Sequence, residues 1–137
     1  MGFDFGKGNL NKLAEAGYEF ELVYPATDEP TGAFITVRGD KSPVVQAYDR
    51  QMINQTMLQS KQKQKKNQPD EAPTIEDYIE KACKRAAVKT IGWRGILVDG
   101  EEVAFTTEAA EKFYLANDWV REAVESESND LSNFRPK

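Results

Sequence analysis

This chain of 137 residues has 23 acidic and 18 basic side chains and a net charge of −5, which makes nucleic acid a poor partner. It contains no histidine and one cysteine, which excludes Ser-His-Asp and Cys-His hydrolases, zinc fingers and histidine-ligated metal sites. No apolar run approaches the roughly 20 residues that span a bilayer, so we expect no membrane partner, and no residue pattern indicates a cofactor.

The N-terminal part of the chain predicts a β-hairpin. Residues 1–17 are rich in glycine, with a short helical stretch at 10–16, and the first of them are expected to be mobile. Residues 18–24 alternate with period two and place Tyr18, Phe20 and Leu22 on one face. A turn composition at 25–32 leads to a second strand at 33–38. A helix must cover the apolar face of this antiparallel pair.

A helix over 42–58 follows the hairpin. Ser42 supplies an N-cap and Pro43 the first helical position. One apolar stripe contains Val45, Tyr48 and Met52, and a second, neighbouring stripe contains Ile53, Met57 and Leu58. The second stripe either belongs to the core or receives a client helix or a second copy, and methionine suits such an adaptable surface. Residues 60–68 are polar and predict a helix end that frays into a linker.

The next helix is predicted over 74–90. Thr74 and Asp77 form a capping-box pattern at its start. The helix carries its apolar residues at helical spacing, namely Ile75, Tyr78, Ile79, Ala82 and Ala86. Cys83 lies among small residues, so we interpret it as a buried packing residue.

The C-terminal part predicts a small hairpin and two helices. Glycines around Trp93 break the preceding helix, and Asp99-Gly100 joins short strands at 96–98 and 103–105. Thr106 or Thr107 begins one helix, and Asn117-Asp118 begins the last. The fold class is therefore α+β, mainly helical, with an N-terminal antiparallel hairpin and a second small hairpin. We divide it into 1–60, a polar linker at 61–73, and a helical subdomain at 74–137, which could also form one compact domain.

Charge is distributed unevenly along the chain. Residues 61–91 contain eight basic and five acidic groups, whereas residues 92–137 contain five basic and ten acidic groups. This asymmetry favours head-to-tail contact between copies, or contact with an oppositely charged partner.

Two aromatic residues near the C-terminus have two interpretations each. Trp119 either anchors the core or acts as an interface hot spot. Phe134 stands in a polar tail and either folds back onto the core or docks into a partner. The candidate partner-binding residues are therefore Ile53, Met57, Leu58, Trp119 and Phe134.

Residues 91–134 contain short motifs in a fixed order: a tryptophan between glycines, an Asp-Gly turn, a Phe-Thr helix start, a second tryptophan and an Asn-Phe terminus. The matching positions are Trp93, Gly95, Asp99, Gly100, Phe105, Thr106, Trp119, Asn133 and Phe134. This order resembles the tail assembly chaperones of long-tailed bacteriophages. The N-terminal hairpin departs from the mainly helical structure expected of that family.

The resemblance implies a non-catalytic protein that binds the tape measure protein, keeps it soluble and helps the tail tube protein to polymerise around it. It also implies self-association, a location in the host cell cytoplasm and absence from the mature virion. An alternative is a structural virion protein, such as a head-decoration or minor tail component. A carboxylate-dependent enzyme is a third class, which the missing histidine disfavours.

Overall fold

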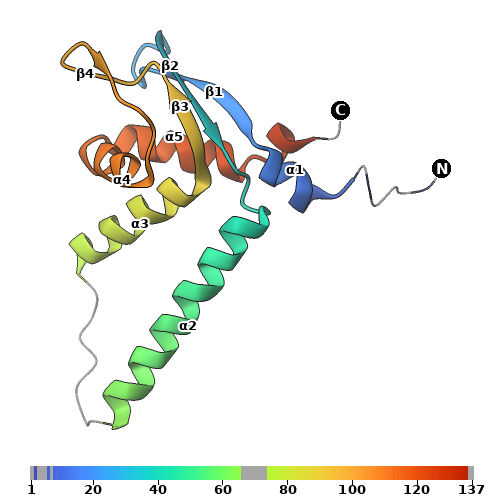
Figure 1. The fold of residues 1–137 in the computed structure, drawn as a ribbon, viewed down its shortest axis with the longest axis vertical. Helices are drawn as coiled ribbons and strands as arrows, with labels where there is room; N and C mark the ends of the chain where they lie inside the picture. Colours follow the sequence, from blue (N-terminus) through green and yellow to red (C-terminus); the bar gives the residue numbers. More distant parts are fainter. Residues whose placement is uncertain (1, 3–5, 7, 66–73, 136–137) are drawn as a thin grey trace.

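The computed structural model describes residues 2, 6, 8–65 and 74–135. The expectation of mobility for the first residues therefore falls largely outside the described residues. So does the part of the predicted linker at 66–73. In chain order the elements are α1 (Leu10–Ala16), β1 (Tyr18–Val23), β2 (Pro30–Val37), α2 (Pro43–Lys65), α3 (Ile75–Lys89), β3 (Thr90–Arg94), β4 (Leu97–Val98), β5 (Glu101–Glu102), α4 (Thr107–Ala116), α5 (Asp118–Asn129) and the 3₁₀ helix η1 (Leu131–Phe134) (Figure 1). The predicted α+β, mainly helical class is confirmed.

The larger sheet has β2 at its centre, antiparallel to β1 on one side and to β3 on the other. Ile35 pairs with Phe20 of β1 and with Trp93 of β3. The first pairing confirms the predicted hairpin. The strand β3 was not predicted, because the glycines around Trp93 hide it from local periodicity. Gly95 ends β3 with φ 77°, and a Cβ there would lie 2.5 Å from the carbonyl oxygen of Gly32.

The core lies where α3, α4 and α5 meet this sheet. α5 packs against β1 and β2, and α3 packs against α4 and α5. Tyr114 is fully buried, and its hydroxyl lies 2.7 Å from Thr90 Oγ1. The other buried apolar side chains of this core are Leu22, Ala33, Ile35, Val37, Cys83, Ala86, Ala87, Ile96, Ala110, Val120, Val124 and Phe134.

Several predicted helix starts are confirmed by their caps. Thr74 and Asp77 form the capping box of α3, and the Thr106 side chain accepts a hydrogen bond from the Ala109 amide at 3.0 Å. The Asp99-Gly100 turn is confirmed, with φ of 52° and 83° as a tight hairpin turn requires. The first strand, β4, lies within the predicted 96–98, but the second prediction was wrong, because β5 lies at Glu101–Glu102 and residues 103–105 are not in a strand.

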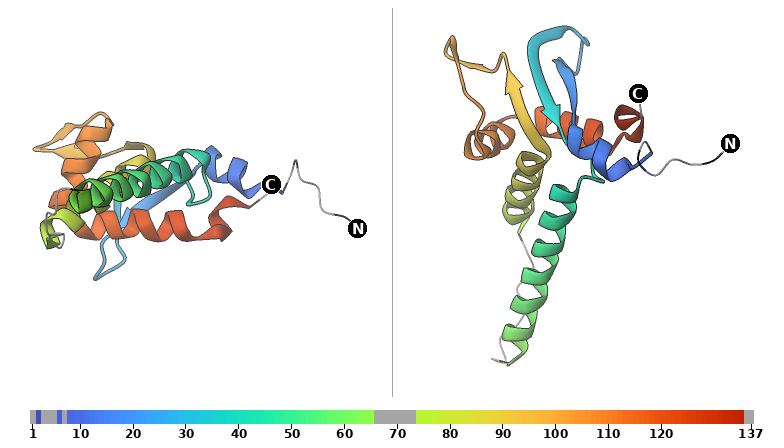
Figure 2. Two further views of the ribbon diagram at one scale, coloured as in Figure 1. Left: turned by 90° about the horizontal axis from the view of Figure 1, so that it is seen from below. Right: turned by 45° about the vertical axis from the view of Figure 1, so that its right-hand side comes forward.

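α2 is longer than its apolar pattern predicts and projects from the rest of the molecule. It runs to Lys65 rather than ending at 58, because the lysines and glutamines that follow are good helix formers. Figures 1 and 2 show that α2 and α3 leave the body at the same place and then diverge. Val45 is fully buried at the root of α2. No helix among the described residues is both long enough and apolar enough to cross a membrane.

Candidate functional site

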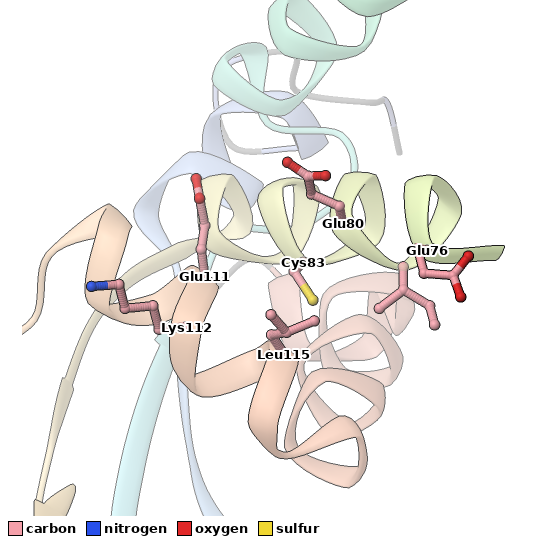
Figure 3. A pocket seen from close by; sticks show the side chains of 7 residues that line it. Glu76, Glu80, Cys83, Glu111, Lys112 and Leu115 are labelled. Atoms are coloured by element: carbon pink, nitrogen blue, oxygen red, sulfur yellow. The ribbon is translucent and has the colours of Figure 1, made fainter. Parts of the chain in front are cut away.

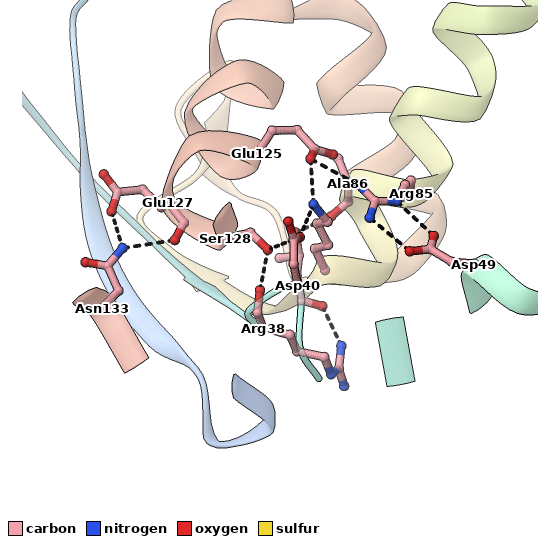
Figure 4. Close-up of polar contacts among 11 residues, drawn as sticks. Arg38, Asp40, Asp49, Arg85, Ala86, Glu125, Glu127, Ser128 and Asn133 are labelled. Atoms are coloured by element: carbon pink, nitrogen blue, oxygen red, sulfur yellow. Dashed lines mark hydrogen bonds and ion pairs between the residues drawn. The ribbon is translucent and has the colours of Figure 1, made fainter. Parts of the chain in front are cut away.

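Ion pairs between three helices fix the direction in which α2 leaves the body. The guanidinium of Arg85 on α3 donates to both carboxylate oxygens of Asp49 on α2, at 2.9 and 3.0 Å (Figure 4). Arg85 also lies 3.4 Å from Glu125 on α5. The hydrogen bond with Asp49 raises the pKa of Arg85 and lowers that of Asp49. A bidentate pair of this kind holds a fixed geometry, so it sets the angle between α2 and α3.

A buried lysine extends this network to the loop before α2. The ammonium group of Lys89 is inaccessible to solvent and donates to Glu125 at 2.6 Å and to Asp40. Ser128 donates to the carbonyl oxygen of Arg38 at 2.6 Å. The loop that carries α2 is therefore tied to α3 and α5 by charged groups as well as by packing.

Next to these ion pairs, α2 and α3 enclose an open cleft of about 330 Å³, which we call the arm cleft. It is lined by Tyr48, Asp49, Met52, Ile53, Thr56, Met57, Lys81 and Arg85. Ile53 is 58% exposed and Met57 is 55% exposed, so the apolar side of α2 faces solvent here. Ile75 and Tyr78, which lie beside Lys81 at the start of α3, are also exposed.

The exposure of Ile75 and Tyr78 shows that only part of the predicted apolar stripe of α3 is buried. They continue the apolar stripe of α3, but the body ends near Cys83, and the first turns of the helix extend beyond it. Sequence reasoning therefore missed the contribution of α3 to the arm cleft. The signal was present in the large apolar side chains that directly follow the polar sequence 60–73.

The structure brings only some of the predicted partner-binding residues together. Ile53 and Met57 line the arm cleft, whereas Leu58, 60% exposed, is on the same helix but outside the lining. Trp119 is half-buried and stacks on Tyr24, with ring centroids 6.1 Å apart. Phe134 is buried in the core with its ring edge-on to Tyr18, so it folds back and presents no surface to a partner.

A second open surface lies between α3 and α4, and we call it the acidic groove. It encloses about 460 Å³ and is lined by Glu76, Ile79, Glu80, Cys83, Glu111, Lys112 and Leu115. Cys83 and Leu115 face each other across it, and the glutamates project around them (Figure 3). Cys83 is buried, as predicted, whereas Leu115 is 61% exposed. Sequence reasoning missed this groove because its two walls come from separate helices.

Neither surface holds an arrangement suited to metal chemistry. Among the described residues, no three His, Cys, Asp or Glu side chains are placed to hold a metal ion. Burial raises the pKa of Tyr114, which lies in the core rather than in a cleft. Both surfaces instead combine exposed apolar side chains with charged rims, a composition suited to protein binding.

The fold is that of a small α+β protein, and the arm cleft and the acidic groove are open, partly apolar surfaces on it. The chain matches the model of the YdaY prophage protein family over residues 41–137, more than half of its length, and it belongs to that family. It is therefore a phage-associated protein. The match covers α2 and everything after it, including both surfaces, and leaves the β1–β2 hairpin outside. No curated protein and no solved structure matches the chain.

Proposed function

We propose that this phage protein is a tail assembly chaperone. It binds the tape measure protein, keeps it soluble in the host cell cytoplasm and promotes polymerisation of the tail tube protein around it, without catalysis and without entering the mature virion. The observation that carries the proposal is the arm cleft, an exposed apolar surface between two diverging helices in a phage-associated protein. The motif order in residues 91–134 supports the same function.

The arm cleft has the chemistry needed to hold a client helix. A helix laid between α2 and α3 would cover Ile53 and Met57, which are each more than half exposed in the free protein. Methionine side chains adapt to clients of varied sequence. Lys81 at the cleft favours a client helix with acidic residues beside its apolar face. In this binding mode the chaperone covers the apolar stripe of the long helical tape measure protein until the tube protein takes its place.

Co-expression with the tape measure and tail tube proteins of the same phage tests the proposal. The wild-type protein should retain the tape measure protein on a pull-down and raise its soluble fraction. The variant I53D/M57D should weaken that binding about 30-fold, which corresponds to roughly 2 kcal/mol, the loss typical of an interface hot spot. The matched control N54D adds a carboxylate to an exposed position outside the cleft lining and should bind like wild type.

Two outcomes would contradict this function. Binding of the tape measure protein by I53D/M57D at wild-type strength would remove the arm cleft from the interaction. Absence of any binding, together with a fixed copy number of the protein in purified particles, would favour the alternative of a structural virion protein. Quantitative mass spectrometry of purified particles measures that copy number.

A further inference from the structure

The acidic groove is an apolar surface without a partner within the chain. Leu115 on α4 is 61% exposed at its mouth, and Ile79 and Cys83 of α3 form its other side. Glu76, Glu80 and Glu111 line it together with Lys112, and Glu80 also pairs with Lys84 at 3.2 Å. A ligand for this groove needs an apolar side chain at its centre and positive charges around it.

The outer side of α2 has those features. Successive residues of an α-helix point about 100° apart, so Leu58 points away from the face on which Met57 lines the arm cleft. Leu58 is 60% exposed. Lys61 lies one turn after it and is also exposed. Residues 50–69 contain five basic residues and no acidic ones.

We propose that the outer side of α2 in one copy docks into the acidic groove of another copy, with Leu58 inserted between Ile79 and Leu115. The cations around Leu58 then face the groove glutamates. A copy cannot fill its own groove, because α2 lies along the face of α3 that carries Lys81, and the groove is on the opposite face with Cys83. Lys81 and Cys83 are two positions apart on α3, so their side chains point about 200° apart around the helix.

This contact is heterologous, since the donor and acceptor surfaces differ. A bound pair leaves one α2 and one groove unoccupied, so assembly continues into a ring or an open chain. The arm cleft is not part of the contact, and a row of copies would leave every arm cleft available. The proposal therefore does not depend on the identity of the client.

The test uses the full chain and two variants. Arm variant L58N/K61Q removes the apolar centre and one cation of the donor surface, and groove variant E80K/L115K places two cations in the acceptor surface. All four positions are exposed, so the fold should be retained, which circular dichroism and thermal unfolding check. Sedimentation velocity is measured for each protein alone and for the two variants mixed.

The wild-type protein should show an average mass that rises with concentration and falls when 1 M NaCl screens the charged rim. Each variant alone should associate at least tenfold more weakly. Mixed in equal amounts, they should form a 1:1 dimer and stop there, because only the groove of the arm variant and the α2 of the groove variant are intact. The control I53N/M57N, altered in the arm cleft alone, should assemble like wild type.

Three results would overturn the proposal. They are a wild-type protein that stays monomeric at high concentration, a single variant that still associates like wild type, or a mixture that forms no 1:1 complex. Dimers that form but never grow in the wild type would indicate a two-fold contact instead. Normal assembly without any tape measure binding would refute the chaperone function and leave this contact standing.

Discussion

The two ends of α3 lie in opposite surroundings. At its C-terminal end the helix buries Ala86, Ala87 and the ammonium group of Lys89, whereas Ile75 at its N-terminal end is 75% exposed. A lysine is thus covered and an isoleucine is not, the reverse of the usual distribution. The contrast follows from position, because the C-terminal end of α3 leads directly into β3 of the sheet, and the buried residues of α3 all lie from Cys83 onward.

This contrast separates a body from an arm. The body comprises the sheet, α4, α5 and the C-terminal half of α3, and the arm comprises the exposed part of α2 and the first turns of α3. Apolar residues in the body contribute to folding, whereas those in the arm are available for binding. Substitutions of similar chemistry should therefore have different effects in the two regions.

The largest effect is expected at the centre of the body. Replacing Tyr114 by alanine removes a fully buried ring and leaves Thr90 Oγ1 without its hydroxyl partner. The free energy of unfolding should fall by about 4 kcal/mol, measured by urea denaturation followed by circular dichroism. A loss below about 1 kcal/mol would show that Tyr114 is not a core residue.

A smaller effect is expected at the junction of body and arm. Replacing Lys89 by methionine leaves the carboxylates of Asp40 and Glu125 close together without their shared cation. Because both acids are partly exposed, the loss should be near the lower end for a broken buried pair, about 3 kcal/mol. Lys84→Met, at an exposed position on the same helix, is the matched control and should change stability by less than about 0.5 kcal/mol. Equal unfolding midpoints in urea for the two variants would contradict a structural role for Lys89.

Sequence reasoning succeeded where the determining contacts are local. The cap at Thr74, the Asp99-Gly100 turn and the period-two strand at 18–24 all depend on neighbours within a few residues, and each was confirmed. The strand β3 was missed because its partner β2 is distant in the chain, so no local pattern reports the pairing. After residue 58 the apolar pattern ends, but the helix continues to Lys65 on the propensity of its lysines and glutamines.

The candidate surfaces were only partly predictable for the same reason. The apolar stripe containing Ile53 and Met57 could be read from helical spacing, but whether it is core or surface depends on how far α2 extends beyond the body. Phe134 and Trp119 could not be assigned at all, since their surroundings come from β1 and from the β1–β2 turn. Both depend on tertiary packing that one sequence does not display.

A weaker, pH-dependent effect should distinguish the ionic root of the arm from the packed body. The hydrogen bond from Arg85 lowers the pKa of Asp49 below its ordinary value of 3.8, so the folded protein releases that proton more readily than the unfolded chain. The stability from this pair is therefore present above pH 3.8 and is lost as the pH falls through the lower folded value.

The variant D49N removes this contribution. At pH 7 its free energy of unfolding should fall by no more than about 1 kcal/mol, because the side chains of Arg85 and Asp49 are each about one-third exposed to solvent. Its difference from wild type should shrink as the pH falls below 3.8. Hydrogen exchange in α2 should speed up in the variant while exchange in α5 stays slow. A difference in stability that persists unchanged at pH 2.5 would show that the pair does not act through its charge.

The smallest effect on stability is expected in the arm itself, at Tyr78. This tyrosine is 73% exposed, so Tyr78→Ala should change the free energy of unfolding by less than about 0.5 kcal/mol, against the loss predicted for the same substitution at Tyr114. Binding of the tape measure protein, measured by calorimetry or pull-down, should nevertheless weaken about tenfold, because a large aromatic beside the arm cleft is a typical hot spot. Loss of stability without loss of binding would place Tyr78 in the body rather than in the arm.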